Sequence, residues 1–263
     1  MDDLKGIHMI SEISSNSNPV IKYACSLSRA KARAEHGQHF IEGEKLVREA
    51  GESGIRLTHV FAEDRSVAAL YEERCEHVFT VPRHVMEKMC ESRTPQHICA
   101  IADTPKQKEQ GSFEGSGFVV ALDAVQDPGN VGTIIRSADA FGAACVLLGQ
   151  GCADPFSGKV LRASMGSVYH LPILQTADLH RSLSESREEG FQLICGHLKG
   201  TTDLKLRSDR AVIVIGNEGN GVSDRVAELC DLYRIPMKGK AESLNASAAA
   251  SILIYIFAKE IGS

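Results

Sequence analysis

The sequence has no strong excess of positive or negative charge, no closely spaced pair of cysteines of the Cys-x-x-Cys type and no long apolar run. Its 263 residues carry a net charge of −5, so any site for a polyanion has to be a local patch. The eight cysteines include no Cys-x-x-Cys pair, which is typical of reduced thiols in a cytoplasmic protein. The longest apolar run, 246–258, is too short to span a bilayer, and the first residues show no signal-peptide pattern. We therefore expect a cytoplasmic protein with no membrane role.

The patterns of several enzyme classes are also missing. No histidines, cysteines or carboxylates have the spacing of metal ligands or of an activated nucleophile, so metal-assisted hydrolysis and acyl-enzyme chemistry have little support, and no metal is expected. The glycine-rich loop 216–221 has its glycines in the order G-x-x-G-x-G and lacks a following Lys-Ser/Thr. It therefore matches neither the dinucleotide-binding pattern nor a phosphate-binding P-loop.

The order of apolar runs predicts an α/β protein with two domains. Residues 1–15 show little pattern, 16–102 predict a small α/β domain, and 103–117 are polar and rich in turn formers, as in a linker. In the first domain we expect strands and helices in these segments: strands 58–61, 78–81 and 98–101, and helices 67–74 and 83–90.

In the second domain, residues 118–263, apolar runs alternate with helical segments. Such alternation predicts a mostly parallel sheet with helices on both faces, and ligands bind beyond the carboxyl ends of its strands. The expected strands are 118–125, 144–148, 171–174, 192–195, 211–215 and 232–236, and the expected helices are 131–141, 158–168, 179–189, 222–229 and 243–259.

Three loops of the second domain follow expected strands. The first, 126–132, opens a helix that Asn130 is placed to cap, and one turn later Arg136 stands in a run of small and apolar residues. An unpaired guanidinium there would be costly unless it met an anion. The second loop, 216–221, carries Glu218, which ordinary turn chemistry explains equally well.

The third loop, 235–247, runs into the alanine-rich helix at the end of the chain. Ser243 is placed to cap this helix, and Asn245 adds an amide that both donates and accepts hydrogen bonds. The main-chain groups of such a loop can bind the edge of a small heteroaromatic ligand. An ordinary helix cap is the simpler interpretation of this segment taken alone.

The three loops together resemble the signature motifs of the SpoU/TrmH branch of the SPOUT RNA 2′-O-ribose methyltransferases. The matching patterns are Asn130-x-Gly132-x-x-x-Arg136, Gly216-x-Glu218-x-x-Gly221 and Ile235-Pro-Met-x-Gly-x-x-x-Ser-Leu-Asn-x-Ser247. The segment from Asn18 to Lys45 resembles, more loosely, the substrate-binding domain of relatives that act on large-subunit ribosomal RNA. The resemblance implies a trefoil knot in the C-terminal domain, S-adenosylmethionine as cofactor and a homodimer formed through that domain.

The resemblance also implies roles for individual residues. The catalytic residues would be Asn130, Arg136, Glu218, Ser243 and Asn245. The cofactor would be bound by Gly216, Glu218, Ile235, Met237, Ser243, Leu244 and Asn245. RNA would contact Arg136 and a basic cluster of the first domain, Lys22, Arg29, Lys31 and Arg33, although a solvated helix face is the usual explanation of such a cluster.

The predicted reaction is the S-adenosylmethionine-dependent 2′-O-methylation of RNA, with 23S ribosomal RNA as the expected substrate. Arg136 is always protonated, so orientation of the hydroxyl and binding of phosphate suit it better than the role of a base. Three alternatives stay open: tRNA as the substrate, a non-catalytic RNA-binding or ribosome-assembly module on the same fold, and, more distantly, a dinucleotide-dependent oxidoreductase.

Overall fold

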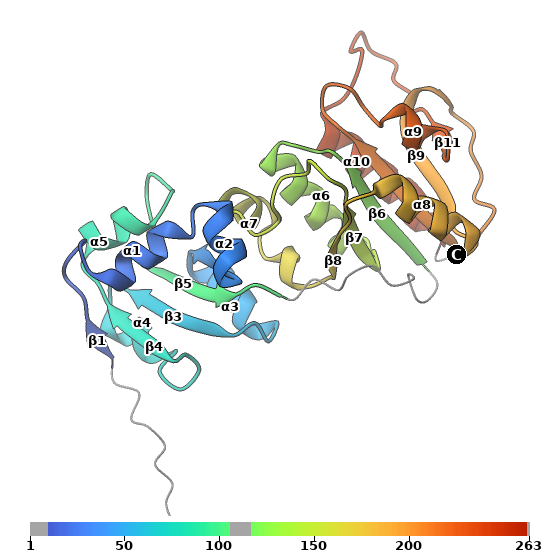
Figure 1. Ribbon diagram of the computed structural model, residues 1–263. Helices are drawn as coiled ribbons and strands as arrows, with labels where there is room; N and C mark the ends of the chain where they lie inside the picture. The colour runs from blue at the N-terminus through green and yellow to red at the C-terminus, as the bar shows by residue number, and fades with distance from the viewer. Residues whose placement is uncertain (1–9, 106–116, 262–263) are drawn as a thin grey trace, which may run out of the picture. The chain divides into compact units, whose positions relative to one another are not determined.

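The computed structural model describes residues 10–105 and 117–261 and divides into two compact units (Figure 1). The N-terminal unit comprises the chain up to Pro105 together with the segment Phe156–Arg162, and the C-terminal unit comprises the rest. Most of the predicted linker, 106–116, lies outside the described residues, as does the greater part of 1–15.

The N-terminal unit is built on a mixed sheet of five strands in the order β1-β4-β3-β5-β2. The pairs β1–β4 and β3–β4 are parallel, whereas β5 runs antiparallel to both β3 and β2. The strands are β1 Ser11–Glu12, β2 Gln38–Glu42, β3 Leu57–Ala62, β4 His77–Thr80 and β5 Ile98–Asp103.

Five helices accompany this sheet. α1 begins at Pro19 because Asn18 caps it by accepting a hydrogen bond from Val20 N at 2.8 Å, and because proline suits the first helical position. Ile21 of α1, Met86 of α5 and Phe61 of β3 belong to one buried hydrophobic core. The helices are α1 Pro19–Ser26, α2 Ala30–His36, α3 Glu44–Glu52, α4 Arg65–Ala69 and α5 Arg83–Met89.

The C-terminal unit contains six strands in the order β11-β9-β10-β6-β7-β8, and every pair is parallel. This arrangement confirms the predicted α/β fold class with a parallel sheet. The strands are β6 Gly117–Asp123, β7 Cys145–Leu148, β8 Ile173–Gln175, β9 Gln192–Thr201, β10 Arg210–Gly216 and β11 Asp231–Tyr233.

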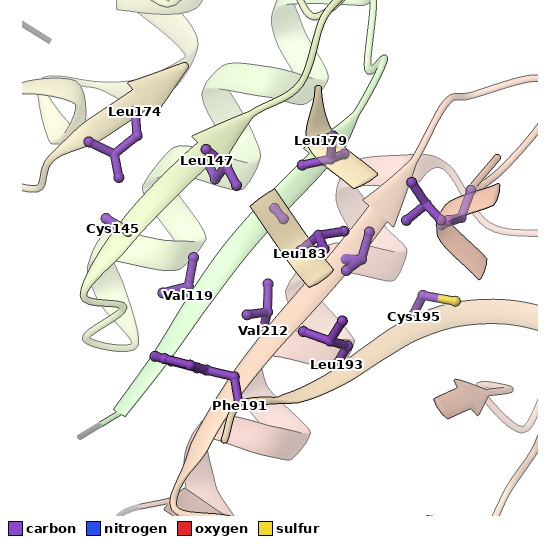
Figure 2. Close-up of a cluster of buried hydrophobic side chains, with 14 residues drawn as sticks. Val119, Cys145, Leu147, Leu174, Leu179, Leu183, Phe191, Leu193, Cys195 and Val212 are labelled. Atoms are coloured by element: carbon purple, nitrogen blue, oxygen red, sulfur yellow. The ribbon is translucent and has the colours of Figure 1, made fainter. Parts of the chain in front are cut away.

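Helices cover both faces of this sheet, which explains why its central strands are apolar at almost every position. Alternate residues such as Val119, Leu193 and Val212 form a core with Leu183 of α8 and Val226 of α9 (Figure 2). α10 contacts β10, β6 and α6. The helices of this unit are α6 Pro128–Ala140, α8 Leu179–Glu188, α9 Asp224–Ala227 and α10 Ala246–Ile261, with a 3₁₀ turn at Ser167–Tyr169. Most of α7, Gly158–Ser164, belongs to the segment that is part of the N-terminal unit.

β9 is much longer than the predicted strand 192–195. It pairs with β11 at Cys195 opposite Leu232 and again at Thr201 opposite Tyr233, so residues 196–200 form a bulge between the two pairs. A Cβ atom at Gly200 would lie 2.6 Å from the backbone of Leu232, so only glycine fits where the two chains come closest. The hydrophobic pattern predicted the buried half of the strand and missed this exposed half.

Candidate active site

Two of the predicted loops begin side by side at the carboxyl edge of the parallel sheet. β6 ends at Asp123 and β10 at Gly216, and these two residues are partners in the register. The loops that follow carry Asn130 and Glu218 respectively. The parallel register therefore brings together motifs that lie about 90 residues apart in the chain, as the 88-residue separation of the Asn130–Glu218 hydrogen bond shows.

Glu218 binds the first loop through its carboxylate. Oε1 accepts hydrogen bonds from Asp127 N and from Asn130 Nδ2, both at 3.0 Å, and Oε2 accepts one from Gln126 N at 3.2 Å. Partial burial raises the pKa of this carboxyl, but the hydrogen bonds from Asn130, Asp127 and Gln126 outweigh burial and leave the pKa below its ordinary value. The carboxylate is therefore an ionised anchor for the loop, and it is poorly suited to accept a proton.

Asn130 does not cap α6, contrary to the prediction. Asp127 is the N-cap, because its Oδ1 accepts a hydrogen bond from Asn130 N at 2.9 Å and proline follows at the first helical position. The Asn130 side chain is instead buried, with 7% of its surface exposed. It donates to Glu218, and its Oδ1 accepts from Asn245 Nδ2 at 3.0 Å.

Asn245, rather than the predicted Ser243, caps α10. Its Oδ1 accepts hydrogen bonds from Ser247 N at 2.9 Å and from Ala248 N at 3.3 Å, and the helix begins at Ala246. An asparagine one residue before the helix reaches these amides, whereas Ser243 lies too far upstream. A continuous chain of side-chain hydrogen bonds, Glu218 to Asn130 to Asn245, thus joins all three motifs to the start of α10.

A cavity of about 520 Å³ lies beside this chain of hydrogen bonds, which is within the range of small-molecule sites. Six of the seven predicted cofactor-binding residues line it: Gly216, Glu218, Ile235, Met237, Ser243 and Leu244. The seventh, Asn245, is absent from the lining, as are Asn130 and Arg136.

The walls of the cavity fit S-adenosylmethionine, which has an adenine ring, polar edges and a positively charged sulfur. The lining combines apolar side chains from Ile235, Met237 and Leu244 with the main chain of the glycine-rich loop. A Cβ atom at Gly216 would lie 2.1 Å from the backbone of Gly221 and Val222, so glycine is required for the loop to close. Within the described residues no group of three or more His, Cys, Asp or Glu side chains could hold a metal ion.

Asn217 is a site residue that the sequence analysis missed. Its Oδ1 accepts hydrogen bonds from Gly219 N at 2.9 Å and Asn220 N at 3.2 Å, and its Nδ2 donates to Ala124 O at 2.9 Å. Asn217 therefore shapes the glycine-rich loop and ties it to the end of β6. The signal was an asparagine two residues before a glycine, which is typical of an Asx turn.

Four further residues of the lining were also missed: Gly196, His197, Leu198 and Lys199. They belong to the bulge of β9, a segment in which the strand was predicted to have ended already. Periodicity gave no signal for them, because a bulge breaks the alternation of side chains.

Arg136 lies on the exposed surface of α6, and no ion pair of its side chain is present among the described residues. Its guanidinium is solvated, so the predicted cost of an unpaired charge in apolar surroundings was wrong. The neighbouring apolar residues Ile134, Ile135 and Ala138 are buried, while Arg136 lies on an exposed side of the helix. Arg136 therefore needs no anion to stabilise it, and its guanidinium is free to bind an anionic ligand.

The basic cluster of the N-terminal unit separates into exposed and buried members. Lys22, Arg29 and Lys31 are exposed. Arg33 is 7% exposed and donates hydrogen bonds to Leu27 O at 2.8 Å and Ser28 O at 2.9 Å. Arg33 holds the turn between α1 and α2 and is not available to RNA, which corrects its predicted role.

Comparisons with known proteins match both units. A model described as the SpoU rRNA Methylase family matches residues 117–255, more than half of the chain. The chain belongs to this family. A second model, described as the MRM3-like substrate binding domain, matches residues 18–100. Together the two matches cover most of the chain.

Relatives and solved structures agree with this assignment. The chain is 34% identical over 247 residues, 93% of its length and 98% of the relative's, to the 23S rRNA (guanosine(2553)-2′-O)-methyltransferase RlmP of Bacillus subtilis. The S-adenosylmethionine-bound rRNA methyltransferase of Sinorhizobium meliloti superposes with a TM-score of 0.84 at 33% identity, covering 95% of this chain and 98% of that one.

A third protein has the same fold with its cofactor in place. The SpoU methyltransferase AviRb of Streptomyces viridochromogenes, in complex with S-adenosylmethionine, has a TM-score of 0.83 at 26% identity, with 94% of this chain and 99% of that one covered. The predicted enzyme class, an S-adenosylmethionine-dependent RNA 2′-O-ribose methyltransferase, is thereby confirmed for this member of the SpoU family.

Proposed function

We propose that this enzyme methylates a ribose 2′-hydroxyl of 23S ribosomal RNA in the cytoplasm. The observation that carries the proposal is the hydrogen-bonded chain Glu218–Asn130–Asn245 beside a cavity of cofactor size. The name of the Bacillus subtilis relative supports 23S ribosomal RNA as the substrate. No helix in the described part of the chain is long and apolar enough to cross a membrane.

The cofactor supplies an electrophilic methyl group on its sulfonium, so the protein mainly has to align the hydroxyl with that methyl group. The main chain at Gly216, Ile235, Met237 and Leu244 would hold the cofactor, and Ser243 and Glu218 would border it. Asn130 and Asn245 act from behind the cavity wall by fixing the loops. We therefore assign these two asparagines a positioning role.

Arg136 would bind the phosphate next to the target ribose. It is exposed, permanently charged and carried by α6, the helix whose first turn Glu218 anchors through Asn130. Neither Arg136 nor the hydrogen-bonded Glu218 is suited to take the hydroxyl proton. We propose that a phosphate of the RNA or a water molecule accepts it.

The binding of substrate RNA would begin at the N-terminal unit. The exposed Lys22, Arg29 and Lys31 can neutralise phosphates, and the MRM3-like substrate binding domain model covers all three positions.

We also propose that the enzyme is a homodimer with a trefoil knot in the C-terminal unit. The inward side of α10 is buried at Leu253 and Phe257, whereas Ile252 and Tyr255 are 37% and 54% exposed. Phe141, which is 41% exposed, lies 5.6 Å from Tyr255 between ring centroids. A second subunit would cover this apolar surface of α10 and α6.

Mapping of 2′-O-methylated nucleotides in 23S ribosomal RNA, with and without the gene, tests the proposed reaction. We expect one site to disappear and to return when the purified enzyme and cofactor are added to unmodified RNA. The guanosine named for the Bacillus subtilis relative is the first position to inspect. Methylation of tRNA alone would contradict the choice of substrate, and cofactor binding without methylation of any RNA would favour a non-catalytic module.

The position of the cofactor can be tested separately by calorimetry. Leu244 lines the cavity and is 38% exposed, so Leu244→Trp should fill the cavity without disturbing the core. We expect S-adenosylmethionine binding to fall at least tenfold. Gly216 is a poorer choice, because any side chain there meets the backbone of Gly221. Unchanged affinity of Leu244→Trp would place the cofactor elsewhere.

A further inference from the structure

Four side-chain rings lie close together in the N-terminal unit, two of them from neighbouring strands of its sheet. We name Tyr23, His36, His59 and His77 the ring cluster. The ring centroids of Tyr23 and His36 are 5.0 Å apart, those of Tyr23 and His59 are 6.2 Å apart, and those of His59 and His77 are 4.9 Å apart. The rings come from four different elements, α1, α2, β3 and β4.

The ring cluster extends the hydrophobic core to the surface. His59 and His77 are partners in the parallel register of β3 and β4, and Phe61 and Phe79 are partners two residues further along the same face. Phe61 is completely buried, whereas His36 and His77 are exposed. The rings of the cluster meet edge-on or tilted, at interplanar angles of 89°, 58° and 41°, and they lead from the buried Phe61 to the exposed His36 and His77.

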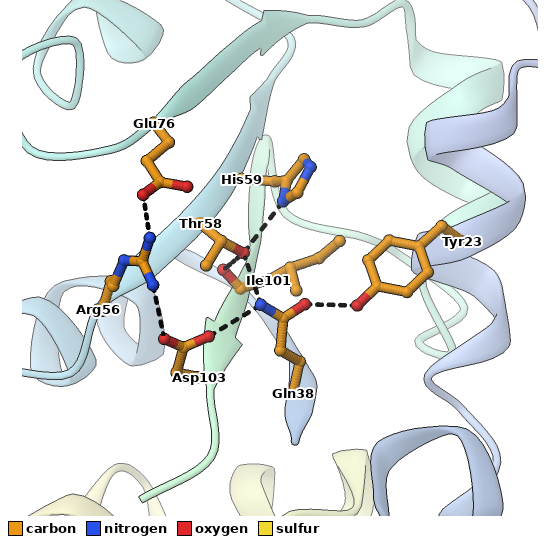
Figure 3. Close-up of polar contacts among 8 residues, drawn as sticks. All are labelled: Tyr23, Gln38, Arg56, Thr58, His59, Glu76, Ile101 and Asp103. Carbon is orange, nitrogen blue, oxygen red and sulfur yellow. Dashed lines mark hydrogen bonds and ion pairs between the residues drawn. The ribbon is translucent and has the colours of Figure 1, made fainter. Parts of the chain in front are cut away.

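Hydrogen bonds hold the inner rings (Figure 3). The Thr58 hydroxyl lies 3.2 Å from Ile101 O and 3.0 Å from His59 Nδ1. His59 is therefore held through Nδ1, and its Nε2 is left for another partner. Burial and the neighbouring His77 lower the pKa of His59, which keeps this ring neutral.

The charges around the ring cluster do not favour phosphate. Glu76 and Asp103 lie beside the rings, and Arg56 forms ion pairs with both of them, at 3.3 Å in the case of Asp103 (Figure 3). The Tyr23 hydroxyl donates to Gln38, which in turn donates to Asp103 Oδ1 at 2.8 Å. One guanidinium thus faces two carboxylates, so an uncharged ligand face suits this surface better than a phosphate does.

We propose that the ring cluster binds an unpaired nucleobase of the RNA substrate, which stacks on the exposed imidazoles. Unpaired RNA bases are recognised by stacking on aromatic and histidine rings and by hydrogen bonds to their edges. His59 Nε2 has no hydrogen-bond partner among the described residues and suits a polar group on the edge of a base. The proposal rests on RNA as the substrate, and it adds a base contact to the phosphate contacts of Lys22, Arg29 and Lys31.

The test measures binding of a 23S ribosomal RNA transcript that contains the guanosine named for the Bacillus subtilis relative. For the double variant His36→Ala/His77→Ala we expect roughly tenfold weaker binding, since loss of one stacked base has about this effect. The slope of the logarithm of affinity against the logarithm of salt concentration should stay unchanged, because no phosphate contact is lost. Cofactor affinity should also stay unchanged.

Three variants control for charge, shape and position. His36→Phe/His77→Phe keeps the rings and should retain binding. Lys22→Glu/Lys31→Glu should lower the salt slope, in contrast to the histidine variants. His84→Ala removes a histidine of α5 that is exposed and outside the ring cluster, and it should bind RNA normally. The single variant His77→Gln serves if the double alanine variant does not fold.

The outcomes separate this inference from the proposed function. Unchanged RNA binding by folded histidine variants would overturn the inference and leave the proposed function intact. A reduced salt slope in His36→Ala/His77→Ala would also overturn it, because the lost contact would then be to phosphate. Failure of the unmutated enzyme to bind any RNA would overturn both.

Discussion

At the scale of single residues, the family motifs contain two kinds of residue. Gly216, Met237 and Leu244 border the cavity, whereas Asn130 and Asn245 lie outside its lining and hold the loops. Sequence spacing identified all of these positions without distinguishing the two kinds. To tell the residues that line the cavity from those that hold the loops, one must know the partners of each hydrogen bond. These partners depend on where the three loops lie in the folded protein.

Glu218 offers the sharpest test of the positioning role. Glu218→Gln keeps the shape but replaces one acceptor oxygen with an NH₂ group, which would face the N–H groups of Asp127 and Asn130. We expect methyl transfer to fall by at least a hundredfold and cofactor affinity to fall as well, because the first and second loops lose their connection. Activity should be measured with saturating RNA, and affinity by calorimetry.

Glu242→Gln is the matched control for this variant. Glu242 lines the same cavity and is exposed, and it should tolerate the change with little effect. If Glu218→Gln kept its activity while Glu242→Gln lost it, Glu242 and not Glu218 would be the functional carboxylate.

His39 predicts a pH dependence of stability in the N-terminal unit. Burial and, to a smaller extent, the nearby Arg33 lower the pKa of His39 from 6.5 to about 3, against a smaller opposing effect of Asp103. The unfolded chain therefore binds a proton at a higher pH than the folded chain does. The contribution of the neutral His39 to the stability of the folded protein is complete above pH 6.5 and is lost progressively as the pH falls towards 3.

The measurement compares thermal unfolding of the unmutated protein and of His39→Asn at a series of pH values. His39→Asn does not titrate, so its unfolding temperature should fall less steeply between pH 6.5 and 4. His84→Asn, at an exposed histidine, should follow the unmutated protein. Parallel curves for His39→Asn and the unmutated protein would show that His39 is not the group responsible.

At the scale of elements, periodicity predicted the centres of helices and strands better than their ends. The parallel strands of the C-terminal unit were found because both of their faces are buried, which makes them continuous apolar runs. The caps were less predictable. Several polar residues stand before each helix, and the one that caps it depends on the exact turn of the chain, as Asp127 and Asn245 show.

The cap of α10 can be tested by two alanine variants. Asn245→Ala removes the acceptor for Ser247 N and Ala248 N and should lower the free energy of unfolding by about 1 kcal/mol. It should also reduce activity, because the bond to Asn130 is lost. Ser243→Ala, at the residue that the sequence suggested as the cap, should leave stability unchanged. Denaturant unfolding measures both effects, and a larger loss for Ser243→Ala would restore the original assignment.

At the scale of the whole molecule, the spacing of three motifs identified the family and the cofactor, although no single motif would have done so. The motifs converge because β6 and β10 are neighbours in the sheet even though β7, β8 and β9 separate them in the chain. The hydrophobic pattern of the sequence does not predict this order of strands in the sheet. The ring cluster could not be predicted from the sequence either, because its histidines come from separate elements and none of them belongs to a recognisable motif.

The proposed dimer makes a prediction about the surface of α10. Ile252 and Tyr255 are exposed in a single chain, so a charged side chain there costs little unless another subunit covers it. If the dimer forms through α10, Ile252→Glu would bury an unpaired charge and should split the dimer or unfold it. Leu70→Glu is the matched control, because Leu70 is 70% exposed and lies in the N-terminal unit. Light scattering of the unmutated protein at micromolar concentration should give twice the chain mass of 28.4 kDa. Leu70→Glu should give the same value. A monomeric mass for the unmutated protein would exclude the dimer.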